Sequence, residues 1–343
     1  MVSIVDVAKR ANVSITTVSR VLSGSAHPVS EETRARVLEA AESLNFSPSA
    51  LAQAMVTRAT RIVGVIIGDA VDPYFATIVR GVEDVARRHG YLVIVCNSDR
   101  VPEIELQYLH TLGSYRVDGV IFAGGGLTDA TYQHKVNQSL EAFYSRGAVC
   151  VSLAKHLVSS FSVLVDNEQV VKDAMHYLIE LGHRSIGYIS GPKLLTTTQL
   201  RFDGYKSALA AHGLAFNPDL VFDGDYKYES GLQAGQTIAA LPVKPTAVLA
   251  SNDLMAIGCL VGLREAGCHI PQDISVMGID DIATAQFVDP SLTTIALPLY
   301  ELGATGMQSF VNLRHKELPE NDSLTLPHHL VVRKSVAAPR EGD

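Results

Sequence analysis

Hydrophobic residues near the start of the chain recur every three to four positions, which is the spacing of amphipathic helices. Two short segments of this kind lie in DVAKRANVSITTVSRVL, from Asp6 to Leu22. Asn12 separates them, and asparagine tolerates the left-handed conformation that ends a helix. Ser14 then offers an N-cap for the second segment. The pattern predicts two helices joined by a tight turn.

Each predicted helix buries one face and exposes the other. The inward residues are Val5, Val7 and Ala8 in the first helix and Val18, Val21 and Leu22 in the second. The second helix presents Ile15, Thr16, Ser19 and Arg20 to the outside. A helix-turn-helix that reads a DNA major groove has this pattern, but so does an ordinary helical hairpin. A third helix, starting near Ser30, completes an all-α domain over residues 1–46.

The pattern changes at Ser47-Pro48, where proline interrupts the helical spacing. The eight residues SALAQAMV that follow have a helical pattern but are too few for a stable isolated helix. A linker over residues 47–61 is the simplest interpretation of this segment.

From Ile62 onwards, short apolar strands alternate with helical segments. IVGVII, YLVIVC, GVIFAG and AVCVSLA are separated by helices, and the alternation restarts near Val163 with SIGYIS, TAVLAS and ISVMGI. Strands that alternate with helices indicate parallel sheets with right-handed crossovers. We therefore predict an α/β core of two doubly wound lobes, which face each other across a cleft.

Composition and charge restrict the environment of the chain. Its 343 residues suit two or three domains, and its net charge is −8. Residues 1–61 carry an excess of two positive charges. Contacts to DNA phosphates would thus depend on backbone amides, hydroxyls and a few basic side chains. The four cysteines are scattered along the sequence, which is typical of thiols in a reducing compartment. No membrane-spanning segment or signal peptide is apparent, so we expect a cytoplasmic protein.

Catalytic and metal-binding motifs are missing from the sequence. Gly124, Gly125 and Gly126 lack the spacing of a dinucleotide loop, and no GxxxxGK[ST], GxSxG or HExxH occurs. The pair His328-His329 has no carboxylates at ligand spacing. We expect no catalytic residues, no metal and no cofactor.

Polar and aromatic residues instead follow the predicted strands. The positions are Asp72 to Phe75, Asp166-Asn167, Arg201, Tyr226, Asn252-Asp253 and Asp280-Asp281. Carboxylates, an amide and a guanidinium can bind the hydroxyls of a sugar-like ring, while aromatic rings cover its apolar face. Each residue taken alone could equally be a helix N-cap or a surface group.

Several motifs resemble the LacI/GalR family of bacterial repressors. They are DVAKRANVSITTVSRVLSG, VSEETRARVLEAAESLNFSPSALA, VDNEQ, ELGHRSIGYISGP, RFDGYKSAL, SNDLMAIG, VMGIDD and LTTIALP, in this order. The resemblance runs from about Ser3 to about Ser335. It implies a periplasmic-binding-protein-like core over residues 62–335, with a hinge helix in residues 47–61 and a tail over 336–343. The final helix and the strand LVVR would return to lobe 1, so that lobe 1 spans about 62–162 and 292–335 and lobe 2 about 163–291.

The resemblance also implies the binding residues. The effector-contacting positions match Phe75, Asp166, Arg201, Tyr226, Asn252 and Asp280, whereas Asp253 and Asp281 are interpreted as caps. The DNA-contacting positions match Ser14, Ile15, Thr16, Thr17, Ser19 and Arg20 in the second helix. Met55 lies where the family usually has the leucine that wedges into the minor groove.

The predicted function is a sequence-specific transcriptional repressor that binds double-stranded operator DNA. A small effector, a sugar or sugar derivative, would bind between the lobes and control operator affinity. The chain would act as a homodimer at the nucleoid, since one helix-turn-helix covers only a half-site. Two other classes stay open, namely a solute-binding protein of a transport system and a sugar-modifying enzyme.

Overall fold

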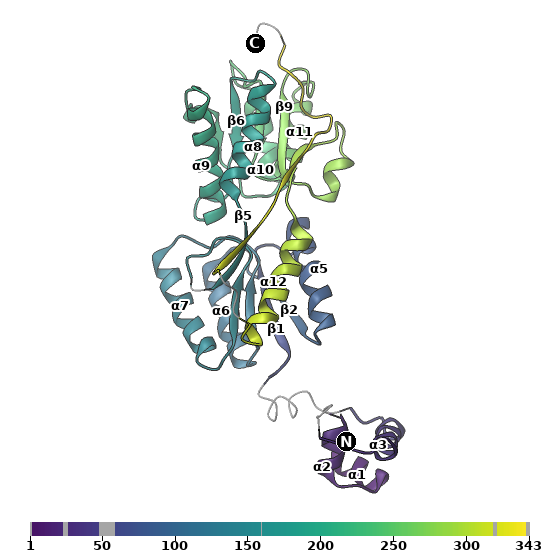
Figure 1. Cartoon of the computed structure of the whole chain (residues 1–343). Coiled ribbons are helices and arrows are strands. Elements are labelled where there is room, and N and C mark those ends of the chain that lie inside the picture. The colour runs from purple at the N-terminus through teal and green to yellow at the C-terminus, as the bar shows by residue number, and fades with distance from the viewer. Residues whose placement is uncertain (1, 23–26, 48–58, 159, 318–320, 341–343) are drawn as a thin grey trace. The chain divides into compact units, whose positions relative to one another are not determined.

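The computed structural model describes residues 2–22, 27–47, 59–158, 160–317 and 321–340. Its contacts divide the chain into two units, Met1–Arg61 and Ile62–Asp343. Within the described residues, the first unit carries three helices, and the second carries two sheets with helices on both faces (Figure 1).

The first unit is a small bundle of α1 (Ile4–Ala11), α2 (Ile15–Leu22) and α3 (Glu31–Ser43). Its core contains Val7, Ala8, Ala11, Val18, Val21, Val37, Ala40 and Ala41. Asn12 has a φ of 53°, so the predicted left-handed end of α1 is confirmed. Ser14 caps α2, because its Oγ accepts the backbone N–H of Thr17 at 3.1 Å. The prediction for Val5 is wrong, since this side chain is 40% exposed.

The first sheet of the second unit has the strand order β11-β5-β4-β3-β1-β2. Its strands are β1 (Ile62–Ile67), β2 (Leu92–Asn97), β3 (Gly119–Phe122), β4 (Val149–Ser152), β5 (Phe161–Val165) and β11 (Ser323–Leu326). All of them pair in parallel. Helices α5 (Pro73–Arg88) and α12 (Leu299–Arg314) pack together, as do α6 (Pro102–Ser114) and α7 (Ala130–Tyr144). We call this sheet and its four helices lobe 1.

The second sheet has the order β12-β10-β9-β8-β6-β7. Its strands are β6 (Ile186–Ile189), β7 (Val221–Phe222), β8 (Ala247–Ala250), β9 (Ser275–Asp280), β10 (Thr293–Ala296) and β12 (His329–Val331). Helices α8 (Asn167–Glu180) and α9 (Thr196–Ala211) form one packed pair, and α10 (Tyr228–Ala239) and α11 (Asp253–Glu265) form the other. This sheet and these helices are lobe 2, so the predicted doubly wound architecture is confirmed.

The strand pairing places three segments in a different lobe from the one that we predicted. β5 pairs with β4, so the chain enters lobe 2 after Val165 rather than before Val163. β10 pairs with β9 in lobe 2, although we assigned residues 292–335 to lobe 1. β12, which contains part of LVVR, pairs antiparallel with β10 in lobe 2. Only α12 and β11 return to lobe 1 in the described part of that segment.

The C-terminal segment is bonded to lobe 2 beyond the predicted start of the tail. The Val276 N–H donates to the Ser335 carbonyl at 2.9 Å, and the Ala337 N–H donates to the Ser275 Oγ at 3.1 Å. Arg340 forms an ion pair with Asp273 at 2.8 Å. Residues 336–340 therefore form part of the lobe.

The close packing of α10 on α11 positions two cavity residues. Both helices carry glycines at their contact, and a Cβ on Gly258 would overlap the Tyr228 carbonyl and lie 2.6 Å from the Leu232 nitrogen. Tyr226 precedes α10 and Asn252 caps α11. The separation of the two helices thus determines how far Tyr226 lies from Asn252.

We predict that Gly258→Ala destabilises the core by about 1–3 kcal/mol, since the added methyl group forces the helix backbones apart. Urea unfolding of the full chain measures this change. The control is Gly113→Ala in α6, where an added Cβ would lie 3.6 Å from the Phe143 ring, an ordinary contact. The control should be neutral or slightly stabilising, because alanine favours helix over glycine. Equal effects of the two substitutions would contradict the packing argument.

Candidate functional site

The exposed face of α2 is the first candidate site. Ile15 is 48% exposed, and Thr16, Ser19 and Arg20 are also exposed, as the helical spacing predicted. Val18 and Val21 are buried on the opposite side. The Oγ of Ser14 and the Oγ1 of Thr17 lie 2.9 Å apart at the start of the helix. Hydroxyl groups at a helix N-terminus are typical phosphate contacts in protein–DNA complexes. Met55, the predicted wedge residue, lies outside the described residues.

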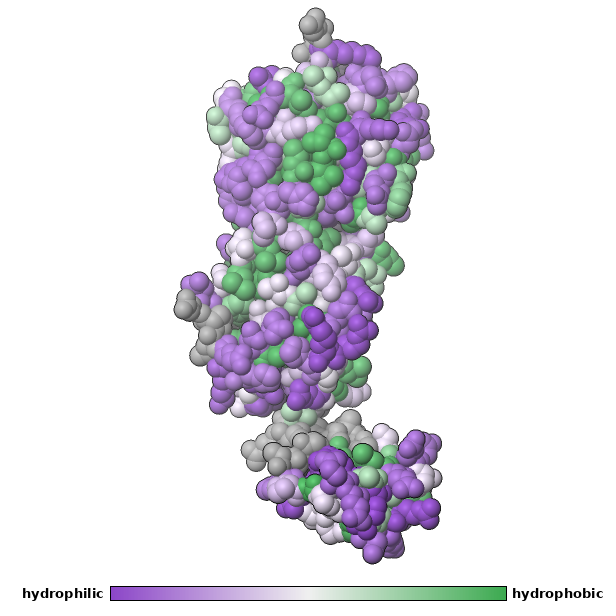
Figure 2. Space-filling view, turned by 45° about the vertical axis from the view of Figure 1, so that its right-hand side comes forward, coloured by the Kyte–Doolittle hydropathy of each residue, from purple (hydrophilic) through white to green (hydrophobic). Residues whose placement is uncertain are grey.

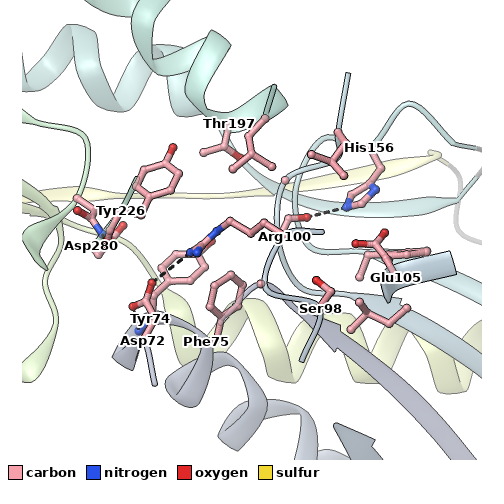
Figure 3. Close-up of a pocket in the computed structure, with 18 of the residues that line it drawn as sticks. Asp72, Tyr74, Phe75, Ser98, Arg100, Glu105, His156, Thr197, Tyr226 and Asp280 are labelled. Atoms are coloured by element: carbon pink, nitrogen blue, oxygen red, sulfur yellow. Dashed lines mark hydrogen bonds and ion pairs between the residues drawn. The ribbon is translucent and has the colours of Figure 1, made fainter. Parts of the chain in front are cut away.

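The second candidate site is a cavity between lobes 1 and 2. It encloses about 690 Å³, part of which is open to solvent, and it lies at the carboxyl ends of strands in both sheets. Phe75, Arg201, Tyr226, Asn252 and Asp280 line it together. Figure 3 shows Tyr226 and Asp280 on one side of the cavity, and His156 and Glu105 on the other.

Asp166 is the one predicted effector residue that does not line this cavity. Its carboxylate accepts the Gln169 N–H at 3.0 Å and caps α8, and the side chain is exposed. The neighbouring Asn167 points inward instead, where its Oδ1 accepts the Arg201 Nε–H at 2.8 Å. The prediction that Asp166 lines the cavity is therefore wrong, and Asn167, the next residue along the chain, points inward in its place.

Arg201 is buried at the lobe 2 end of the cavity, with 3% of its surface exposed. Besides Asn167, its guanidinium donates to the Ser251 carbonyl and lies 3.4 Å from the Asp280 Oδ1. Burial raises the pKa of the Asp280 carboxyl, and the charge of Arg201 opposes this rise. These contacts fix the guanidinium and direct the Asp280 carboxyl toward the cavity.

Asn252 and Tyr226 form a second fixed pair. The Asn252 Oδ1 accepts the Met255 N–H at 3.0 Å, which caps α11, while its Nδ2 donates to the Tyr226 carbonyl at 2.9 Å. Tyr226 has a φ of 70°, and its hydroxyl lies 2.9 Å from the Thr198 Oγ1. The ring is 8% exposed and forms a wall of the cavity.

The predicted capping roles of Asp253 and Asp281 are wrong. Asp253 is fully buried, and its carboxylate accepts the Thr294 hydroxyl at 2.6 Å and the Ile282 N–H at 2.9 Å. Desolvation raises its pKa to about 7. Asp281 instead forms an ion pair with Arg333 at 2.7 Å. Both residues hold the loop that follows β9 and thereby position Asp280.

Arg100 is a cavity residue that the sequence analysis missed. It follows β2, and its guanidinium carbon lies 5.6 Å from the ring centroids of both Phe75 and Tyr226. Its guanidinium also lies 3.6 Å from the Asp72 carboxylate and 4.0 Å from that of Asp69. Arg100 thus contacts residues of both lobes. The sequence signal that could have identified Arg100 as a cavity residue was its position just after a predicted strand.

Three more residues that were missed lie at the lobe 1 end. Glu105 is 8% exposed, accepts a hydrogen bond from the Tyr132 hydroxyl, and has its pKa raised to about 7 by desolvation. Burial lowers the pKa of His156 to about 4. The third residue is Ser98, whose hydroxyl donates to the Ile67 carbonyl at 2.9 Å.

The lobes are also joined directly by backbone hydrogen bonds beside the cavity. The Thr128 N–H donates to the Leu194 carbonyl at 2.8 Å, and the Thr196 N–H donates to the Gly126 carbonyl at 2.9 Å. Leu127 and Leu195 lie between these bonds as an antiparallel bridge, and both line the cavity. We call residues 126–128 and 194–196 the lobe ladder.

Comparison with known proteins connects the two candidate sites. The family model of the bacterial regulatory proteins, lacI family, matches residues 3–49, and that of the periplasmic binding protein-like domain matches residues 175–336. Catabolite control protein A of Priestia megaterium is 34% identical over 338 residues, covering 97% of this chain and 99% of the relative. The HTH-type transcriptional repressor CytR of Escherichia coli strain K12 is 34% identical over 334 residues, covering 97% of this chain and 96% of the relative. The chain belongs to the lacI family of bacterial regulatory proteins.

Solved structures of the lacI family share the whole fold. The lac repressor dimer bound to operator and the anti-inducer ONPF has a TM-score of 0.85 and 27% identity, covering 98% of this chain and 99% of that one. The transcriptional regulator CelR in complex with cellobiose has a TM-score of 0.72 and 29% identity, covering 98% of this chain and 100% of that one. The chain is thus a DNA-binding transcriptional regulator of the lacI family, which decides against the transport protein and the enzyme that the sequence left open.

The described part of this lacI-family chain contains no group of three metal-ligating side chains. None of the helices in that part is both long and apolar enough to span a bilayer.

The pKa of Glu105 leads to a pH-dependent prediction. Folding raises this pKa from the ordinary 4.5 to about 7, so folding favours the protonated carboxyl. The stability that Glu105 contributes is therefore fully present below pH 4.5 and is lost as the pH rises through 7. Glu105→Gln, which cannot ionise, should exceed the unmutated protein in melting temperature at pH 8, and the difference should shrink at pH 5.

The control for this experiment is Glu103→Gln, because Glu103 is exposed on the same helix. It should show no comparable change between the two pH values. A melting-temperature difference for Glu105→Gln that is the same at pH 5 and pH 8 would show that its carboxyl titrates normally.

Proposed function

We propose that this protein is a repressor whose operator affinity is controlled by a sugar or sugar derivative bound between the two lobes. The observation that carries the proposal is the buried set of Arg201, Asn252 and Asp280 beside the rings of Phe75 and Tyr226. This set combines hydrogen-bonding groups in fixed positions with apolar ring faces, which is the chemistry that a polyhydroxylated ring requires.

Each group has a separate role in this proposal. The Asp280 carboxyl accepts hydrogen bonds from ring hydroxyls, and the Arg201 guanidinium donates to a hydroxyl or ring oxygen. Asn252 can do both through its amide. Tyr226 and Phe75 come from opposite lobes, so a ring between them contacts both. Ligand binding is thereby coupled to the arrangement of the lobes.

Control of DNA binding requires that the effector prefers one lobe arrangement. Such differential affinities commonly amount to about 1–3 kcal/mol. Lobe 1 begins at Ile62, directly after residues 47–61, which connect it to the DNA-binding helices. We propose that this segment, with Met55 as the wedge, forms a hinge helix only in the arrangement that binds the operator. The effector then changes the fraction of the protein that is in the operator-binding arrangement.

On the DNA side, we propose that Arg20, Thr16 and Ile15 contact bases. Ser14 and Thr17 then contact phosphates, and Ser19 is a further DNA-binding residue. Arginine can form a bidentate hydrogen bond to guanine, which is worth about 1–3 kcal/mol of discrimination. The exposed face of α2 carries Ile15, Thr16, Ser19 and Arg20, whereas Ser14 and Thr17 lie together at its start. A helix-turn-helix of this size reads a half-site, so operator recognition needs two copies.

We therefore propose a homodimer that acts in the cytoplasm at the nucleoid. Apolar surface is available for an interface on the second unit. Leu92 and Val95 on the edge strand β2 are 61% and 41% exposed, and Phe287 is 76% exposed. Figure 2 shows apolar areas within a largely hydrophilic surface. The lac repressor structure mentioned above is likewise a dimer on its operator.

Two substitutions should separate ligand binding from DNA binding. Asp280→Ala should weaken sugar binding at least tenfold, because it removes a buried acceptor worth about 1.5–3 kcal/mol, and should leave ligand-free operator affinity nearly unchanged. Arg20→Ala should remove the preference for operator over random DNA and leave sugar binding intact. Calorimetry with a panel of sugars and fluorescence anisotropy with operator DNA measure the two effects.

Matched controls are available for both substitutions. Asp203→Ala removes an exposed carboxylate of α9, which pairs with Lys206 and does not line the cavity, and should leave sugar affinity unchanged. Arg36→Ala removes an exposed arginine of α3 and should leave operator preference unchanged. If Asp280→Ala binds every effector of the unmutated protein with full affinity, the cavity is not the effector site.

A further inference from the structure

The cavity has two polar ends, and the sugar-binding set occupies only one of them. Arg201, Asn252 and Asp280 lie at the lobe 2 end. Ser98, Glu105 and His156 lie at the lobe 1 end. Figure 3 shows Asp280 and Glu105 on opposite sides of the cavity, with Arg100 and Phe75 between them. A single sugar ring held at the lobe 2 end would not contact the polar residues at the lobe 1 end.

Glu105 is the central residue of the lobe 1 end. Burying a carboxyl group is costly unless it is hydrogen-bonded or neutralised. The apolar side chains of Ile66, Phe122 and Leu127 line the same cavity. Among the described residues, Glu105 forms no ion pair, and the Tyr132 hydroxyl donates to one of its two carboxyl oxygens. The second oxygen can accept a hydrogen bond from a ligand in the cavity.

Ser98 and His156 add hydrogen-bond acceptors to the same end. Because the Ser98 hydroxyl donates to the Ile67 carbonyl, only its lone pairs are available to a ligand. The His156 Nε2 lies 2.6 Å from the Gly124 carbonyl and must donate to it, which leaves Nδ1 unprotonated in the neutral ring. The His156 ring also lies 4.8 Å from the Phe122 ring centroid. This end thus combines acceptors with a flat apolar surface.

We propose that the lobe 1 end is a second subsite, which binds a hydrogen-bond-donating unit linked to the sugar. The effector is then a glycoside rather than a free monosaccharide, and its second unit is either another sugar ring or a heterocyclic base. This inference rests on the proposed function, since the first unit occupies the lobe 2 end. Arg100 lies between the two ends and can donate to the oxygens near the linkage.

The hydrogen-bond acceptors at the lobe 1 end disfavour an acidic second unit. A phosphate or carboxylate placed there would lie next to Glu105 and the lone pairs of Ser98. The nearest cation in the cavity is Arg100, which already has Asp69 and Asp72 as partners. Hydroxyl, amino and ring N–H groups fit the acceptors without such repulsion.

The experiment measures the affinities of the full-length protein for ribose, glucose, cellobiose, adenosine and uridine by calorimetry. It compares the unmutated protein with Glu105→Ala, Glu105→Gln and the matched control Glu103→Ala, whose side chain is exposed on the same helix. We expect a glycoside to bind more tightly than its parent sugar. Glu105→Ala should reduce glycoside affinity at least about tenfold, since a hydrogen bond to a buried acceptor is lost.

The other variants distinguish a contact from a general defect. Glu105→Gln retains an acceptor and should restore most of the affinity for a neutral second unit. Glu103→Ala should change nothing. Operator affinity and parent-sugar affinity of Glu105→Ala should match those of the unmutated protein, which also shows that the variant folds. Preference for cellobiose identifies the second unit as a sugar, and preference for adenosine or uridine identifies it as a base.

Two results would overturn the inference in different ways. If ribose or glucose binds as tightly as its glycosides, or if Glu105→Ala weakens both equally, the second subsite does not exist and the proposed function stands. If no member of the panel binds, or if Asp280→Ala leaves their binding unchanged, the cavity is not a sugar site. The proposed function and the second subsite then fail together.

Discussion

The buried guanidinium of Arg201 is the group on which the ligand cavity depends. A charge with 3% exposure is tolerated only when its donors find partners, because its desolvation is costly. Those partners come from three other places in lobe 2, namely Asn167 at the start of α8, the Ser251 carbonyl after β8 and Asp280 at the end of β9. One side chain of α9 therefore holds the ends of three elements in fixed positions. Removing any partner would disturb the others as well.

Several residues that line the cavity have positive φ angles, which residues other than glycine rarely adopt. Tyr226, Asp280 and Arg100 have φ values of 70°, 120° and 59°. Residues in such conformations persist only where their surroundings hold them. Asn252 holds the Tyr226 carbonyl, and Asp253 holds the Ile282 N–H just after Asp280. Interactions outside the ligand's reach thus decide where the ligand-facing groups lie.

Much of the fold could be predicted from the sequence, because apolar strands and amphipathic helices have local patterns. The lobe assignment of β10 and β12 could not, since strand partners far along the chain determine it. Adjacent polar residues were also ambiguous: Asp166 and Asn167 both follow β5, and only the helix geometry turns Asn167 inward. Glu105 looked like an ordinary acidic residue in the first turn of a helix. Its burial follows from α6 packing against the sheet, which no local pattern reveals.

The lobe ladder has a consequence for the time course of ligand exchange. The lobes are joined by covalent crossings and, at residues 126–128 and 194–196, by short backbone bonds that cannot stretch gradually. Backbone hydrogen bonds exist only within a narrow range of distance and angle, so a displacement of the lobes beyond that range breaks the ladder. Separation of the lobes then has a threshold, and the chain switches between two discrete shapes instead of drifting through a continuum. Opening and closing of the lobes therefore includes the breaking and forming of these backbone bonds as a step separate from diffusion of the ligand.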